Sequence, residues 1–155
     1  MKNFFVYNWQ VRDEWFLWSQ QLTLQELVQQ RTGGVGSILH TLFHIVEVEY
    51  SWIRAIQGEE DILYDFSDYK TLNKVSELSN HLRMEIIQCI EECLKGSVEK
   101  LVNVPWDDKN FTIIDILHHL VAHEIHHIGQ LSIWSREMGM EPVPANYIGR
   151  KLFED

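Results

Sequence analysis

Histidine is the residue type in this chain whose number and spacing best fit a chemical role. The sequence has 155 residues and eight histidines, five of which lie within ten consecutive positions: His118, His119, His123, His126 and His127. A buried imidazole needs a partner for each of its two ring nitrogens, so packing alone explains such a cluster poorly. Imidazole is also the commonest side-chain metal ligand, and we therefore expect a metal site.

His123 and His127 have the spacing of two ligands to one ion. Four positions apart on a helix, their rings lie one above the other with Cβ atoms about 6 Å apart. A third ligand must come from another segment, where His40 and His44 are the candidates. These two are also four positions apart on one face, so geometry does not choose between them. The alternative interpretation is that all of these residues are ordinary core or surface histidines.

The ion itself can be narrowed by the ligand type. Three neutral imidazoles suit a divalent metal ion, with Zn²⁺ or Ni²⁺ the first candidates and Mn²⁺ or Fe²⁺ the next. Three protein ligands leave one or more positions for water or substrate. Such a centre acts as a Lewis acid, either on water or on a bound thiol.

The same residues satisfy the H-E-x-x-H signature of zinc peptidases, in which the glutamate is the general base. Glu124 would take that role here. A peptidase of this type also needs a further ligand downstream, and Ile133 stands where the extended motif has its third histidine. On a helix, Glu124 points about 100° away from His123. Peptidase activity is therefore a minor alternative, and we assign Glu124 no catalytic role.

Long helices must position these side chains, because apolar residues recur at helical spacing and the prolines fall between or after such segments. Ser37 and Thr112 are candidate N-caps, and Gly58 suits the end of a helix. No stretch alternates with period two for long enough to suggest a sheet. The pattern predicts an all-α four-helix bundle, a fold that builds metal sites from inward-facing side chains. We expect helices over residues 3–20, 37–57, 71–95 and 112–138, and a short helical turn after Thr23.

The histidines of the last expected helix point the same way as its apolar residues, towards the core of the bundle. Glu47 on the second helix and Gln130 on the fourth lie near the same faces and could orient an imidazole or a water. The roles of His119 and His126 stay open. On a helical wheel one sector holds Ile116, Leu120, His123, His127 and Trp134, with His119 and Gln130 at its margins.

Length and composition set further bounds. We expect one domain over residues 1–155, because the chain is long enough for one core and short for two. The formal net charge of −10 argues against a nucleic-acid partner and an anionic membrane surface. No apolar run is long enough to span a bilayer, and two cysteines four apart in an expected helix would stay reduced. We therefore expect a cytoplasmic protein.

Six tryptophans could line a pocket or a subunit interface, although core packing is the simpler role for most of them. Trp9, Trp15 and Trp18 point to more than one face of the first expected helix. We expect these three to be the ones that leave the bundle core.

The segments that carry the histidines also resemble a known family. Residues 117–131, LHHLVAHEIHHIGQL, are similar to the N-or-A-H-E-x-H-H-x-G-Q-L pattern of the DinB-like proteins, also called the DinB/YfiT superfamily. Residues 44–52, HIVEVEYSW, resemble that family's H-x-x-x-x-E-x-x-W segment, and residues 138–142, MGMEP, resemble its helix exit. The resemblance covers the chain from about Ser37 to its end, and residues 117–131 are its specific part.

The resemblance implies a four-helix bundle with a divalent metal held by three histidines, which map to His44, His123 and His127. It selects His44 over His40. It further implies a homodimer and a metal-dependent enzyme for a small-molecule substrate, either a hydrolase or a transferase that uses a low-molecular-weight thiol. The alternative is a non-catalytic, metal-stabilised helical dimer that binds a ligand or partner.

Overall fold

The protein is described by a computed structural model in which residues 1–152 are placed and most of them are helical. The four long helices and the short helix after Thr23 are confirmed, each long one within one residue of its expected limits. The expected single domain covers residues 1–155, and residues 153–155 lie outside the part that the structure describes. The elements are α1 (Lys2–Ser19), α2 (Leu24–Val28), α3 (Ile38–Gln57), the 3₁₀ turn η1 (Phe66–Asp68), α4 (Leu72–Lys95), β1 (Leu101–Asn103), β2 (Asn110–Thr112) and α5 (Ile113–Glu137).

The ends of the two helices that carry the histidines follow from local chemistry. The Ser37 hydroxyl accepts a hydrogen bond from the backbone N–H of His40 at 3.2 Å and so begins α3. Gly58 ends it with φ at 75°, a left-handed conformation that glycine adopts without strain. Thr112 begins α5 by accepting from the backbone N–H of Asp115 at 3.2 Å. These caps fix where each helix starts and therefore which residues face inward.

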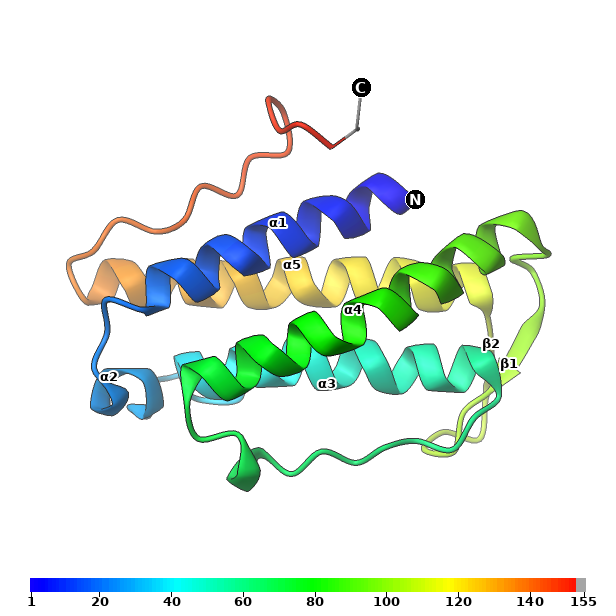
Figure 1. The fold of residues 1–155 in the computed structure, drawn as a ribbon, viewed down its shortest axis with the longest axis horizontal. Coiled ribbons are helices and arrows are strands. Elements are labelled where there is room, and N and C mark those ends of the chain that lie inside the picture. Colours follow the sequence, from blue (N-terminus) through cyan, green and yellow to red (C-terminus); the bar gives the residue numbers. More distant parts are fainter. Residues whose placement is uncertain (153–155) are drawn as a thin grey trace.

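The four long helices form a closed ring, which confirms the predicted all-α four-helix bundle. α1 contacts α4 and α5, and α3 contacts the same two helices from the other side. Figure 1 shows that α3 and α4 run in the same direction, because residues 58–71 return along the length of the bundle between them. α3 and α5 run in opposite directions. Two antiparallel neighbours therefore carry the candidate ligands.

The expectation that the chain contains no sheet is wrong at one place. β1 and β2 form a two-stranded antiparallel hairpin just before α5, in which Val102 pairs with Phe111. Each strand has three residues. Such strands are too short to show a period-two pattern, which is why the sequence does not reveal them. The hairpin matters here because β1 contacts α3 and β2 contacts α5.

A C-terminal segment, residues 138–152, returns along the outer side of α1 (Figure 1). The Tyr7 hydroxyl donates to the backbone carbonyl of Ala145 at 2.7 Å, and the Trp18 indole donates to that of Glu141 at 2.8 Å. With α4 and α5 on its other sides, α1 is largely covered. Trp15 is fully buried and Trp9 is 7% exposed, so the expectation that these two leave the core is wrong.

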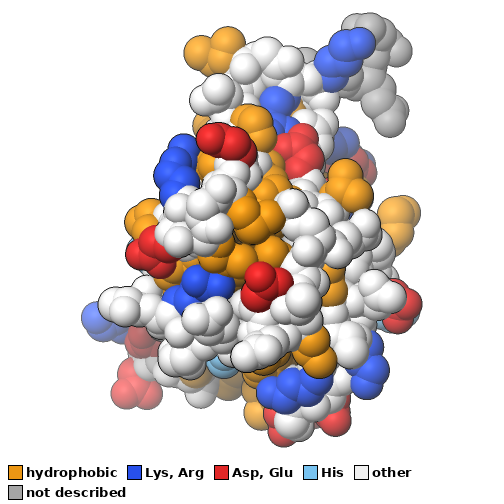
Figure 2. Space-filling view, turned by 90° about the vertical axis from the view of Figure 1, so that its left-hand side faces the viewer, with side chains coloured by type: hydrophobic (Ala, Val, Ile, Leu, Met, Phe, Trp, Pro, Cys, Tyr) orange, Lys and Arg blue, Asp and Glu red, His pale blue; other side chains and the backbone are white. Residues whose placement is uncertain are grey.

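Figure 2 shows the surface at one end of the bundle. Hydrophobic side chains gather in the middle of that face, and positive and negative side chains are scattered around them without a basic patch. Across residues 1–152, none of the helices combines the length and the apolar character needed to cross a membrane.

Candidate metal centre

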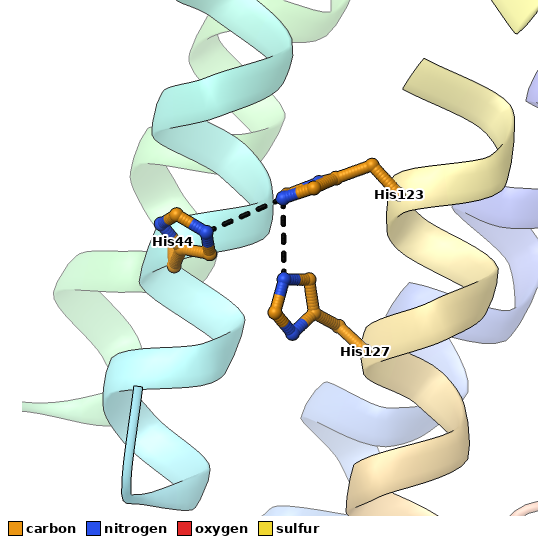
Figure 3. A group of neighbouring side chains, drawn as sticks. All are labelled: His44, His123 and His127. Atoms are coloured by element: carbon orange, nitrogen blue, oxygen red, sulfur yellow. Dashed lines mark hydrogen bonds between the residues drawn. The ribbon is translucent and has the colours of Figure 1, made fainter. Parts of the chain in front are cut away.

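His44 of α3 and His123 and His127 of α5 converge between the two antiparallel helices (Figure 3). One ring nitrogen from each lies within 4.8 Å of the other two. The Nε2 atoms of His44 and His123 are 3.3 Å apart, and those of His123 and His127 are 3.1 Å apart. The structure thus brings together the three residues expected from the sequence, and a metal bound between them stays a prediction.

The spacing of these nitrogens suits a single small cation. A tetrahedral ion with metal–nitrogen bonds of roughly 2.05 Å holds its ligand nitrogens about 3.3 Å apart. The two Nε2–Nε2 distances, 3.3 and 3.1 Å, are close to that value. Two of the three nitrogen pairs therefore already have the separation that such an ion requires.

Hydrogen bonds on the far side of two rings fix which nitrogen carries the proton. Nδ1 of His44 lies 3.1 Å from Oε1 of Glu47, and Nδ1 of His127 lies 2.8 Å from Oε1 of Gln130. Both oxygens are acceptors, so each Nδ1 carries the hydrogen when the ring is neutral, and each Nε2 presents a lone pair. Glu47 and Gln130 thus make the contacts expected of them.

The cluster cannot satisfy its own nitrogens. Nε2 of His123 is close to both other Nε2 atoms, yet a neutral imidazole has at most one hydrogen to donate from it. At least one converging lone pair is left without a donor within the trio. A cation placed among the three nitrogens would accept all three lone pairs, so this donor set fits a metal ion better than it fits a hydrogen-bonded core.

A glycine allows Gln130 to reach its histidine. Gly34 has φ at 52°, and a Cβ built there would overlap the side-chain amide of Gln130. The amide spans two imidazoles, because its Oε1 faces His127 and its Nε2 lies 3.0 Å from Nε2 of His126. His126, whose role the sequence left open, is exposed and supports Gln130 and does not join the three converging rings.

The environment favours neutral rings that remain open to solvent. Burial lowers the pKa of His123 to about 3, with smaller contributions from the neighbouring His127 and His44. Burial also lowers the pKa of His127, which is 6% exposed. The His44 side chain is 25% exposed. His123 and His127 are therefore neutral at pH 7, and the cluster is reachable from the side of His44.

His40, His118 and His119 do not join the three converging rings. The His40 ring stacks on Phe66 of η1, with centroids 4.2 Å apart and planes at 6°. The structure thus places His44, and not His40, beside His123 and His127. His119 is exposed and packs edge-on against Trp52, with centroids 5.3 Å apart. His118 is also exposed.

Glu124, the glutamate of the H-E-x-x-H string, belongs to a different cluster. Both of its carboxylate oxygens accept from the guanidinium of Arg12 on α1, at 2.8 and 2.7 Å. Glu49 on α3 accepts from the same guanidinium at 2.7 Å and from the Trp9 indole at 2.9 Å. Arg12, Glu49 and Glu124 are at most 4% exposed. Glu124 is therefore engaged away from the three histidines, as its wheel position suggested.

Sequence reasoning missed this buried cluster. Its signal was a single arginine in the middle of an aromatic-rich helix, where a long charged side chain needs buried partners. Burial raises the pKa of Glu124, although Arg12 lowers it. Burial lowers the pKa of the Arg12 guanidinium, but the carboxylates of Glu124 and Glu49 outweigh that effect and raise it.

Comparison with known proteins agrees with the fold and with the resemblance noted in the sequence. A sequence profile of the DinB family matches residues 1–153. The uncharacterized protein YizA of Bacillus subtilis strain 168 is 58% identical over 153 residues, which are 98% of this chain and 96% of that protein. The crystal structure of a DinB-like protein from Bacillus cereus ATCC 10987 superimposes with a TM-score of 0.61 at 17% identity, covering 88% of this chain and 91% of the other. That structure supports the fold.

Proposed function

The chain belongs to the DinB family, and we propose that it is a metal-dependent enzyme that binds a divalent cation through His44, His123 and His127 and acts on a small molecule. The observation that carries the proposal is the convergence of three ring nitrogens within 4.8 Å of one another. In two of the three rings, those of His44 and His127, Nδ1 also contacts a side-chain oxygen. These features give the neutral, preoriented lone pairs that a borderline cation prefers.

The ligand set narrows the cation and its chemistry. All three donors are neutral imidazoles, which suit Zn²⁺ or Ni²⁺ first and Mn²⁺ or Fe²⁺ next. With no carboxylate among the three donors, a divalent ion would keep its full charge and polarise water or a thiol as a Lewis acid. Hydrolysis and thiol transfer to an electrophile are the two reactions that this chemistry serves.

The chain's own residues orient the centre and supply little acid–base chemistry. Glu47 and Gln130 hold the rings of His44 and His127 in one tautomer. Both carboxylate oxygens of Glu124 accept hydrogen bonds from Arg12, so the carboxylate is held away from the three histidines. The peptidase alternative loses its general base for this reason. A thiol substrate would suit such a centre, because a bound cation would lower the pKa of the thiol enough for its proton to pass to water.

The proposal extends to setting and assembly. We infer a cytoplasmic homodimer that uses a small-molecule substrate, with a low-molecular-weight thiol as the second substrate in the transferase case. The net charge of −10 supports the further inference that neither nucleic acid nor membrane is a partner.

An activity screen with matched variants tests the proposal. Metal-loaded protein is offered activated esters, and separately electrophiles with several low-molecular-weight thiols. We expect turnover that a chelator abolishes, that His123→Ala lowers at least about 100-fold, and that His118→Ala leaves unchanged because His118 is exposed outside the cluster. Equal rates in His123→Ala would contradict the proposal. Metal binding with no turnover on any substrate would favour the non-catalytic dimer.

A further inference from the structure

A pocket of about 420 Å³ lies where α3, the β1–β2 hairpin and the start of α5 meet. Its volume is within the range that small organic ligands occupy. Side chains from all three elements line it, and most of that lining is aromatic or acidic. The residues that matter here are Trp52, Trp106, Asp107, Phe111, Asp115 and His119, and we call this site the aromatic pocket.

The aromatic rings of the pocket stand at steep angles to one another. The Trp52 ring contacts those of Trp106 and Phe111, with centroids 5.1 and 5.7 Å apart and planes at 88° and 79°. The His119 ring also contacts Trp52, with centroids 5.3 Å apart and planes at 61°. Rings arranged in this way form walls instead of a flat stack. Trp106 is 45% exposed, so its wall is open to a ligand from solvent.

The charges in the aromatic pocket are negative. Asp107 and Asp115 line it, and no lysine or arginine is among the described residues that do. Asp115 lies in the first turn of α5, where its charge offsets the positive end of the helix. Asp107 uses one oxygen to accept from the backbone N–H of Lys109 at 2.9 Å, and its carboxylate keeps further lone pairs free. An anionic group is therefore disfavoured here.

Antiparallel packing places the aromatic pocket beside the candidate metal centre. His119 is one turn before His123 on α5, about 6 Å along the axis, and Trp52 is two turns after His44 on α3. The rings of His119 and His123 are 5.8 Å apart between centroids. The two sites are thus separated by no more than the length of a small organic molecule.

We propose that the aromatic pocket binds an alkylated ammonium group on the substrate, whose other end reaches the candidate metal centre. Cations are attracted to the faces of aromatic rings, and tryptophan is the strongest of these. Two carboxylates add to that attraction, and the ring walls match the apolar surface of an alkylated ammonium. The inference deepens the proposed function, because it names the substrate class for the same centre.

Choline and its neutral isostere 3,3-dimethylbutan-1-ol test the proposal as probes of equal shape. Binding of each is measured by NMR line shifts on metal-free, full-length protein. We expect choline to bind at least about fivefold more tightly than the alcohol. Trp106→Leu should weaken choline binding about tenfold, and Asp107→Asn should weaken it as well. Phe4→Leu, an exposed aromatic residue that packs against Tyr147 elsewhere, should leave it unchanged.

Two results would overturn the proposal: equal binding of choline and the alcohol, or unchanged choline binding in both Trp106→Leu and Trp52→Leu. The same titration on His44→Ala separates this proposal from the metal centre. If metal-free His44→Ala binds choline as tightly as metal-free wild type, the two sites are independent, as expected, because His44 does not line the aromatic pocket. If wild-type protein binds choline but no metal, the aromatic pocket stands and the proposed function fails.

Discussion

Two polar clusters meet at consecutive residues of α5 and have opposite properties. His123 belongs to a histidine trio that is partly open to solvent and leaves at least one of its converging lone pairs without a donor. Glu124 belongs to a buried charged cluster in which Arg12 bonds two carboxylates. One site has unsatisfied lone pairs and the other has nearly complete bonding. The donor set of the trio thus suits the cation proposed above, whereas the charged cluster joins three helices of the bundle.

The two clusters nevertheless depend on the same pair of helices. Arg12 on α1 connects Glu49 of α3 with Glu124 of α5, and these helices carry His44 and His123. A single guanidinium therefore ties together the two helices whose spacing sets the metal centre. The glutamate in the H-E-x-x-H string therefore holds α5 to α1 through Arg12.

The largest expected effect comes from removing the guanidinium. Arg12→Met leaves two buried carboxylates without their partner and should lower the free energy of unfolding by about 3 to 5 kcal/mol. Urea unfolding of metal-free protein measures this loss of unfolding free energy. The matched control is Arg83→Gln, because Arg83 pairs with Asp13 at the surface and its loss should cost less than about 1 kcal/mol. Equal losses in the two variants would remove the contrast between buried and surface pairs.

The next effect concerns Glu124 itself. Glu124→Gln removes a charge-assisted bond to Arg12 and should lower the free energy of unfolding by about 1 to 3 kcal/mol. Metal content should stay at the wild-type level, because the side chain faces away from the trio. Elemental analysis and urea unfolding on the same preparation measure both quantities. Loss of metal at unchanged stability would instead place Glu124 in the metal centre.

The third prediction concerns the oxygen that orients a ring. Gln130→Ala frees Nδ1 of His127 and should weaken metal affinity about 10- to 100-fold, with little change in the stability of metal-free protein. Competition with a chromogenic chelator gives the affinity. Gln88→Ala is the control, because Gln88 is exposed on α4 and bonds Glu92. The orienting role would be refuted by equal affinities in Gln130→Ala and wild type.

The smallest expected effect is on the pH dependence of metal-free stability. The folded-state pKa of His123 is lowered to about 3 from an unfolded value of 6.5, so the unfolded chain binds more protons between these values. The stability contributed by neutral His123 is fully present above pH 6.5 and is lost as pH falls towards 3. Solvent contact at this partly buried ring reduces the size of the effect.

Replacing His123 should change how steeply the free energy of unfolding falls with pH. His123→Gln should show a shallower loss of stability with acid than wild type, measured by urea unfolding across the same pH range. His118→Gln, whose ring is exposed, should retain the wild-type slope. Parallel curves for wild type and His123→Gln would show that this ring does not resist protonation.

Helices and the histidine trio could be predicted from sequence because their signals are local. Ser37, Gly58 and Thr112 mark helix ends by side-chain chemistry within one turn, and the four-residue spacing of His123 and His127 is visible directly. Choosing His44 over His40 needed either family resemblance or coordinates, because both share one face. The choice depends on how α3 packs on α5, which is not a local property.

Other features depend on contacts between distant segments and were missed. Arg12 finds its partners on two other helices, and Trp15 is buried because the C-terminal segment and the neighbouring helices cover α1. The hairpin of β1 and β2 is too short to show alternation. In each case the residue is visible in the sequence, but its contacts depend on segments that are distant along the chain.

The most direct test is the metal content and ligand environment of protein purified without added metal. Elemental analysis should find about one divalent ion per chain, and X-ray absorption should show imidazole nitrogens at about 2.0 to 2.1 Å. His44→Ala, His123→Ala and His127→Ala should each lose the ion, while His40→Ala keeps it. Stoichiometric metal in all three ligand variants, or none in the wild type, would contradict the account.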